Sequence, residues 1–234
     1  TGNEVREIIL KESLKKLIES EYQKLDNVHE PIFFEDLRDI LKKETDVNDS
    51  NYGKLVPANR VCFDRGDIIY NSIKDNILYS NILDIGCNVG WFCFYLSSKG
   101  AICNGVDFDK EKIDFCTMIS DLKNSNCKFD FANVNKEYID SCEEYDIVLC
   151  LSILHLYFTQ HGYSLDEWNC FFKSICSKVK KYLIFEICTS AFKYLEISNY
   201  EEMARIAKEL GDFDNVEIIG KSVEGRSIIL CERA

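Results

Sequence analysis

The sequence predicts an α/β fold: a seven-stranded, mostly parallel sheet with a C-terminal antiparallel hairpin, preceded by an N-terminal helical extension. From about residue 61 onward, short apolar segments alternate with amphipathic ones. Such alternation is typical of parallel strands joined by helices that cover both faces of the sheet. The last two strand-like segments are separated only by the turn Val223-Glu224-Gly225. That turn is too short for a crossover, so these two strands must run antiparallel.

The first part of the chain is expected to be helical. Residues 3–25 place aliphatic side chains at helical spacing between charged ones, and residues 34–41 predict a second, shorter helix. Residues 45–57 are rich in Asp, Asn and Ser and predict a loop. We therefore divide the chain into a helical segment with its loop, residues 1–57, and an α/β domain, residues 58–234.

Within the α/β domain, a helix that carries Ile68, Ile69 and Ile73 is expected to pack beneath the first strand. Strands are expected at 82–85, in a short segment ending at Asp107, and at 127–131, 145–151, 182–187, 216–219 and 226–231. Helices are expected at about 91–98, 112–123, 136–141, 165–179 and 201–210. A loop or short turn is expected at 152–158, and a long connection through Tyr194 is expected after the fifth strand.

Composition narrows the class of protein. The net charge of -12 argues against broad attachment to a nucleic-acid backbone, although it leaves room for a local basic site. No window approaches the roughly 20 apolar residues of a membrane span, and no signal peptide opens the chain. The 12 cysteines are scattered and form no C-x-x-C pair, so we expect reduced thiols in a cytoplasmic protein and no metal site. The chain starts with Thr1-Gly2 and not with Met, so we expect a flanking domain outside this sequence.

The turn Gly86-Cys87-Asn88-Val89-Gly90 joins the first predicted strand to a helix. Glycines at such a junction let the backbone approach a ligand closely, and the start of a helix offers unpaired N–H groups. Asp107 ends the next strand, where an acidic residue commonly binds ribose hydroxyls. These features predict a nucleotide-like cofactor.

Details of the turn favour S-adenosylmethionine (SAM) over NAD or FAD. A dinucleotide site requires G-x-G-x-x-G, and G-C-N-V-G lacks the third glycine. Asp84, at the end of the first strand, suits a cofactor that carries an ammonium and a sulfonium group. The closing antiparallel hairpin is also foreign to the dinucleotide fold.

The motifs LDIGCNVGWF, GVDFD and YDIVLCLSILH resemble those of class I SAM-dependent methyltransferases, which have a Rossmann-like fold, and the resemblance covers about residues 61–233. It implies that Asp107 binds the ribose of SAM, that Phe108 lies beside the adenine, and that Asn133 faces the adenine amino group. Leu151 and Ser152 would lie beneath the reacting methyl group. The full set of cofactor-binding residues that we predict is Asp84, Gly86, Cys87, Asn88, Gly90, Asp107, Phe108, Asn133, Val134, Leu151 and Arg65.

Two groups of phosphate-methylating enzymes are similar in more detail. DIGCNVG, YDIVLCLS and the following loop resemble the Bin3-type RNA 5′-phosphate methyltransferases, but EICTSAFKY after the fifth strand lacks their Pro-Gln-Trp-like run. FDRGDIIYNSI, ILHLYFTQHG and YLIFEI are similar to the methyltransferase domain of O-antigen chain-terminating enzymes. Both groups methylate a terminal phosphate.

Candidate acceptor-side residues follow from the chemistry of methyl transfer. A hydroxyl acceptor needs a general base, whereas a phosphate is already anionic and needs cationic or N–H donors. His155 could act as base or as phosphate donor, Glu186 as base or as an orienting carboxylate, and Arg65 could bind the acceptor phosphate or the SAM carboxylate. The further candidates are Arg60 for the same anions, His161 as a weaker base, and Tyr157 and Trp91 as walls of the site or as core residues.

The sequence therefore predicts a SAM-dependent O-methyltransferase that acts on a small-molecule or glycan acceptor, with a terminal phosphate favoured. Two alternatives stay open. One is an RNA methyltransferase of the 5′-phosphate type, which the acidic composition disfavours. The other is a non-catalytic protein with this fold that uses its N-terminal helices to bind a partner.

Overall fold

A computed structural model describes residues 61–222 and 225–234, and a seven-stranded sheet forms its centre. The strand order is β3-β2-β1-β4-β5-β7-β6. The strands are β1 (Asn81–Ile85), β2 (Ile102–Asp107), β3 (Cys127–Phe131), β4 (Tyr145–Cys150), β5 (Val179–Glu186), β6 (Asn215–Lys221) and β7 (Ser227–Glu232). The first five are parallel, and β7 runs antiparallel to both of its neighbours, β5 and β6. The predicted α/β fold, a seven-stranded, mostly parallel sheet with a C-terminal antiparallel hairpin, is confirmed.

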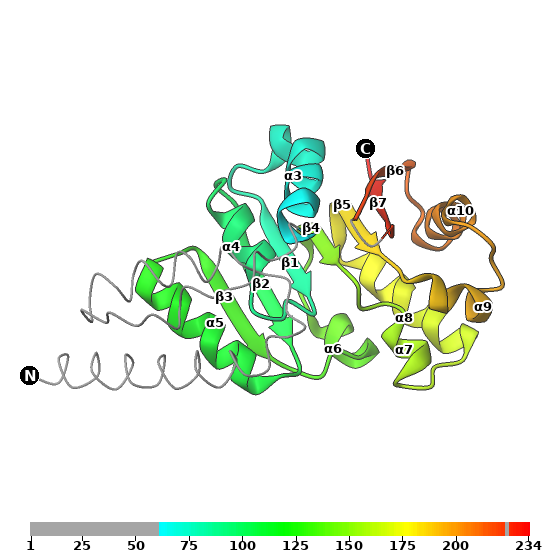
Figure 1. Ribbon diagram of the computed structural model, residues 1–234, viewed down its shortest axis with the longest axis horizontal. Coiled ribbons are helices and arrows are strands. Elements are labelled where there is room, and N and C mark those ends of the chain that lie inside the picture. Colours follow the sequence, from blue (N-terminus) through cyan, green and yellow to red (C-terminus); the bar gives the residue numbers. More distant parts are fainter. Residues whose placement is uncertain (1–60, 223–224) are drawn as a thin grey trace, which may run out of the picture. The chain divides into compact units, whose positions relative to one another are not determined.

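The helices of the described region lie before β1 and in the connections between the strands. They are α3 (Val61–Ile73), α4 (Trp91–Ser97), α5 (Lys110–Lys123), α6 (Lys136–Ser141), α7 (Leu156–Thr159), α8 (Leu165–Ser177), α9 (Phe192–Leu195) and α10 (Tyr200–Gly211), with 3-10 turns η3 (Lys74–Asn76) and η4 (Thr189–Ala191). In Figure 1, α4 and α5 lie beside the β2–β3 end of the sheet, whereas α10 lies beside β6 and β7.

The two faces of the sheet are covered by different helices. Leu83 and Ile85 of β1 belong to a large apolar cluster that also contains buried residues of α8 and α10. Because alternate strand residues point to opposite faces, Ile82 and Asp84 point to the other face, where Cys93 of α4 contacts Asp84. Both faces are therefore covered, as the continuous apolar strands predict.

Helix α3 forms around the expected apolar residues. Ile69 and Ile73 are fully buried. Ile68 lies against Gly220 of β6, where a Cβ atom would come within 2.9 Å of its side chain. The packing of α3 therefore extends to the edge strand β6.

Three element boundaries differ clearly from the sequence expectation. Strand β5 starts at Val179, three residues before the expected start, and α8 ends at Ser177. The lysines that flank Val179 read as a helix C-terminus, but the valine is buried and pairs with Tyr145 of β4. Helix α5 starts at Lys110, two residues early, because the Asp109 side chain accepts hydrogen bonds from its first turn.

Several expectations fall outside the described residues: the helices at 3–25 and 34–41, the loop at 45–57, the start of the α/β domain at 58, and Arg60. Residues 223–224 of the predicted turn are also outside them. Within the described part of the chain, no helix is long and apolar enough to cross a membrane. The thiols of all cysteines from Cys87 to Cys231 are free.

Candidate active site

The glycine turn adopts an alternating left-handed backbone. Gly86, Asn88 and Gly90 have φ values of 75°, 53° and 75°. Asparagine is among the few non-glycine residues that tolerate this region, so Asn88 can stand between the two glycines. A Cβ atom on Gly86 would lie 2.4 Å from Cγ2 of Ile153, and one on Gly90 would lie 2.9 Å from the Phe129 ring. Both glycines are therefore required by conformation and by space.

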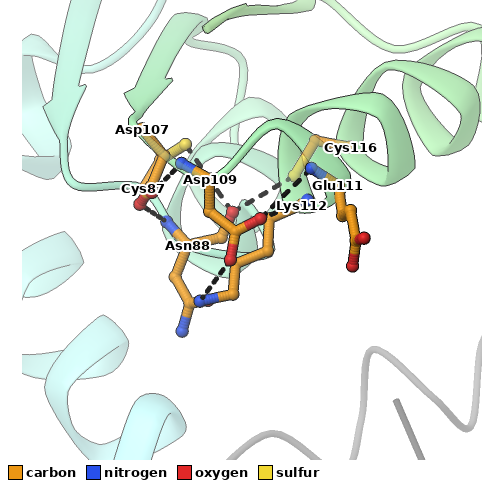
Figure 2. A network of polar contacts seen from close by, with 7 residues as sticks. All are labelled: Cys87, Asn88, Asp107, Asp109, Glu111, Lys112 and Cys116. Atoms are coloured by element: carbon orange, nitrogen blue, oxygen red, sulfur yellow. Dashed lines mark hydrogen bonds and ion pairs between the residues drawn. The ribbon is translucent and has the colours of Figure 1, made fainter. Parts of the chain in front are cut away.

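Asp107 fixes the turn from the end of β2. Its Oδ2 accepts a hydrogen bond from the Asn88 backbone N–H at 2.9 Å, and its Oδ1 accepts one from the Asp109 N–H at 3.0 Å (Figure 2). The side chain is only 6% exposed. Each carboxylate oxygen can accept a further hydrogen bond, so Asp107 can hold the turn and still bind a hydroxyl.

The carbonyl side of the turn is held by two thiols. Cys116 of α5 donates from Sγ to the Asn88 carbonyl at 3.5 Å, and Cys87 contacts the same oxygen at 3.9 Å (Figure 2). Asp109 in turn caps α5 by accepting from the N–H groups of Glu111 and Lys112. Hydrogen bonds thus hold both the backbone N–H and the carbonyl of Asn88.

Asp84 lies at the end of β1 and is almost completely buried. Burial raises the pKa of its carboxyl group to about 7, while a hydrogen bond from the Cys93 thiol at 3.6 Å opposes that shift. The charge of Asp107 raises the pKa of Asp84 further, and the charge of Arg65 lowers it. Asp84 is therefore a carboxyl group whose charge state is sensitive to a nearby cation.

Four side chains meet at the carboxyl edge of the sheet, and we call them the edge network. They are Arg65 of α3, Glu186 at the end of β5, Ser152 just after β4 and Arg226 just before β7. Arg65 Nη1 lies 2.9 Å from Oε2 of Glu186, which is fully buried. The Ser152 hydroxyl donates to the same oxygen at 2.8 Å and accepts from Arg226 Nη1 at 2.9 Å. One carboxylate oxygen thus binds a guanidinium and a hydroxyl, and the hydroxyl links it to a second guanidinium. The other oxygen of Glu186 is buried and has no hydrogen-bond partner among the described residues.

His155 lies close to this network without bonding to it in the described region. Burial lowers the pKa of its imidazole, and the positive charge of Arg226 lowers it further. Its Nδ1 atom is buried and has no hydrogen-bond partner in the described part of the chain. Burial and the charge of Arg226 thus both favour the neutral form of the ring.

The remaining predicted cofactor residues lie at the ends of strands β2, β3 and β4. Phe108 and Asn133 are exposed, whereas Val134 and Leu151 are buried. The carbonyl of Val134 accepts a hydrogen bond from the Tyr157 hydroxyl at 2.7 Å. These positions follow the same carboxyl edge as the glycine turn, which is where ligands bind in open α/β sheets.

The two aromatic candidates for a wall of the site are core residues. Tyr157 is 7% exposed and packs against Phe171 with the ring centroids 4.2 Å apart. Trp91 is 3% exposed and stacks on Tyr95. His161 is exposed and lies against the Tyr157 ring.

Arg226 was not among the site residues predicted from the sequence, although the sequence contains a signal for it. It precedes β7 and directly follows the tight turn that predicts the antiparallel hairpin. Since β7 runs against β5, its first residues must lie at the carboxyl edge of the parallel strands. A charged residue just after that turn is therefore expected beside the site.

The residues at the glycine turn fit SAM. Two buried carboxyl groups, Asp84 and Asp107, end adjacent strands, and the fixed turn lies between them. Carboxylates accept hydrogen bonds from hydroxyls and pair with cations. SAM offers both: ribose hydroxyls, and a methionine part with an ammonium and a sulfonium group.

Comparisons with known proteins agree with this fit. Residues 79–220 match the family model described as "Methyltransferase domain". The O-antigen chain terminator bifunctional methyltransferase/kinase WbdD of Escherichia coli is 34% identical over 118 residues; the match covers 47% of this chain but only 16% of that relative.

Solved structures show the same fold. A crystal structure of WbdD is similar with a TM-score of 0.58 and 21% identity, covering 93% of this chain and 46% of that chain. The magnesium protoporphyrin IX methyltransferase ChlM from Synechocystis PCC 6803 with bound SAM is similar with a TM-score of 0.55 and 17% identity, covering 73% of this chain and 79% of that chain.

Proposed function

This chain belongs to the methyltransferase domain family and is a SAM-dependent methyltransferase, and from that premise we propose that it methylates an anionic oxygen of a small-molecule or glycan acceptor, with a terminal phosphate favoured. The observation that carries the proposal is the edge network. In a chain of net charge -12, the Arg65 guanidinium pairs with Glu186 and the Arg226 guanidinium donates to Ser152, so two cationic groups lie in one network at the carboxyl edge of β4 and β5. Such a cluster suits an acceptor that brings negative charge.

The cofactor is proposed to lie along the glycine turn. The residues from Asp84 to Gly90 would hold its methionine part, and Asp107 its ribose. Phe108, Asn133 and Val134 would border the adenine. Leu151 would lie beneath the reactive end, with Arg65 close by. When bound, SAM supplies a methyl group on a positively charged sulfur, which a nucleophile attacks in line; the protein aligns the two reactants and excludes water.

The acceptor side is proposed to work without a general base. Glu186 is fully buried, and its Oε2 already accepts from Arg65 and Ser152. Its role would be to orient Arg65 and Ser152. An ionised phosphate needs no proton removed before it attacks, so this arrangement is sufficient for it. The neutral imidazole of His155 would donate or accept a hydrogen bond at the acceptor.

A glycan acceptor is proposed by analogy with the relative WbdD, which is described as an O-antigen chain terminator. The aligned segment spans less than a fifth of that relative. The analogy therefore covers the methyl-transfer step alone.

The test combines cofactor binding with a screen of acceptors. We expect S-adenosylhomocysteine to bind the purified chain in calorimetry. We expect methyl transfer from labelled SAM to phosphorylated sugars and none to the same sugars without phosphate. Transfer to a 5′-phosphorylated short RNA but not to sugar phosphates would favour the RNA alternative. Transfer to neutral hydroxyls alone would contradict the anionic acceptor, and failure to bind S-adenosylhomocysteine would contradict the cofactor site.

A further inference from the structure

Arg226 reaches the carboxyl edge of the sheet by a route different from the other site residues. The parallel strands deliver Asp84, Asp107 and Ser152 at their ends, whereas Arg226 stands just before the first residue of the antiparallel β7. The Ser222 N–H donates to the Arg226 carbonyl at 2.8 Å, and the Arg226 N–H donates to the Ser222 hydroxyl at 3.3 Å. The hairpin therefore holds the Arg226 backbone in a fixed place.

Ser152 fixes the side chain of Arg226 as well. Its hydroxyl donates to Glu186, so the hydroxyl oxygen presents its lone pairs to Arg226 Nη1 at 2.9 Å. Ser152 itself has a φ of 61°, a conformation that costs a non-glycine residue free energy. This strained residue directly follows Leu151, at the end of β4. The network thus orients a guanidinium at the point where β4 ends.

The two arginines of the network stand in different surroundings. Arg65 pairs with the buried Glu186 at 2.9 Å and also lowers the pKa of Asp84, so it serves carboxylates of the protein on both β1 and β5. The bond of Arg226 within the network goes to a neutral hydroxyl, and its charge acts on the imidazole of His155. The charge of Arg226 also lowers the pKa of the Cys188 thiol, so this guanidinium stands where the loops that follow β4 and β5 meet.

We propose that Arg226 binds the anionic oxygens of the acceptor phosphate and that Ser152 is a positioning residue that orients the Arg226 guanidinium. This inference rests on the proposed function. It assigns the acceptor anion to the hairpin arginine, whereas the sequence pointed to Arg65. An arginine suits the task because its planar fork of N–H donors matches phosphate oxygens.

The experiment titrates inorganic phosphate into the full chain saturated with S-adenosylhomocysteine and follows binding by ³¹P NMR. We expect Arg226→Met to weaken phosphate binding about tenfold or more, since it removes charge-assisted hydrogen bonds. Arg226→Lys should lose part of the affinity because it keeps the charge but not the fork. The matched control is Arg205→Met, which removes an exposed arginine that pairs with Glu209 on α10. The control should bind phosphate like the unmodified chain.

Ser152 is tested through its coupling to Arg226. Ser152→Ala and Ser152→Gly should weaken phosphate binding equally, because both remove the hydroxyl while only glycine relieves the strained backbone. In the Arg226→Met background, Ser152→Ala should cause no further loss, since a positioning residue acts only through its partner. A structural role alone would give additive losses.

Three results would overturn the proposal: no saturable phosphate binding by the unmodified chain, phosphate binding by Arg226→Met equal to that of Arg205→Met, or loss of S-adenosylhomocysteine affinity in Arg226→Met. Thermal unfolding shows whether each variant is folded. If Arg226→Met does not fold, Arg226→Lys and Ser152→Ala decide the question by the same titration. S-adenosylhomocysteine binding by the unmodified chain reports on the cofactor site alone, so failure of the methyltransferase function remains distinguishable from failure of this assignment.

Discussion

Arg65 and Glu186 form a buried ion pair across 121 positions of the sequence, with 2.9 Å between Nη1 and Oε2. The pair joins α3 to the end of β5. Glu186 is fully buried, and only 12% of the Arg65 side chain is exposed. The guanidinium also lies over the Phe92 ring of α4, 5.2 Å from its centroid. One ion pair of the edge network therefore links α3 to β5, and its guanidinium also contacts α4.

Glu186→Ala should strongly destabilise the protein. The substitution leaves the Arg65 charge buried without its carboxylate, and breaking a buried pair in this way typically costs about 3–5 kcal/mol. The free energy of unfolding, measured with urea, should fall by that order. Glu209→Ala removes the carboxylate of an exposed pair and is the matched control, with little change expected. Equal stability of the two variants would contradict a structural role for Glu186.

Asp107→Ala should weaken S-adenosylhomocysteine binding about tenfold or more, as expected for the loss of hydrogen bonds to a charged group. The substitution removes the proposed ribose acceptor and also frees the Asn88 N–H that holds the glycine turn. Asp114→Ala, which removes an exposed partner of Lys110 on α5, is the control. Calorimetry measures both affinities. Unchanged affinity in Asp107→Ala would rule out the ribose assignment.

Asp84 should make stability depend on pH. Its folded pKa, about 7, lies above the ordinary carboxyl value of 3.8. Between these two pH values the unfolded chain releases a proton that the folded chain keeps. The contribution of Asp84 to the free energy of unfolding is therefore fully present below about pH 4 and is lost as the pH rises to about 7. Asp84→Asn should remove that part of the pH dependence. The measurement compares urea unfolding of both proteins across this range, and parallel curves would contradict the prediction.

Asp84 should also make cofactor affinity depend on pH, in the opposite direction. A cationic ligand group favours the ionised carboxylate, so S-adenosylhomocysteine affinity should rise between about pH 6 and about pH 8 as Asp84 loses its proton. In Asp84→Asn this rise should disappear. Calorimetry at several pH values provides the test. A rise that persists in Asp84→Asn would assign it to another group.

The elements of this fold are predictable because their causes are local. The apolar strand of residues 82–85, the small-residue turn and the polar caps each leave a pattern within a few residues. Asp84 and Asp107 could therefore be chosen as cofactor candidates before the structure was known. The predicted start of β5 was wrong because the lysines around Val179 resemble the end of a helix. The pairing of Val179 with β4 is a tertiary contact that no local pattern indicates.

The edge network was predictable only in part, since its contacts are not local. Arg65, Ser152 and Glu186 were each selected from the sequence, but nothing in it indicates that they share hydrogen bonds. Their meeting depends on how far α3 reaches and on the register between β4 and β5. Arg226 required one further step, which is to follow the direction of β7 to the carboxyl edge.

Gly86→Ala should separate conformational strain from steric conflict when compared with Gly162→Ala. Both glycines have left-handed backbones, with φ of 75° and 69°. A Cβ on Gly162 would have no neighbour within 4 Å, whereas one on Gly86 would lie 2.4 Å from Ile153.

Gly162→Ala should therefore lose only the strain, about 1–2 kcal/mol. Gly86→Ala should lose more, because it adds overpacking worth about 1–3 kcal/mol. It should also lose S-adenosylhomocysteine binding, because Ile153 and the glycine turn must move apart. Urea unfolding and calorimetry measure the two effects. Equal losses of stability in the two variants, with cofactor binding retained, would mean that the loop after β4 yields easily and does not shape the cofactor site.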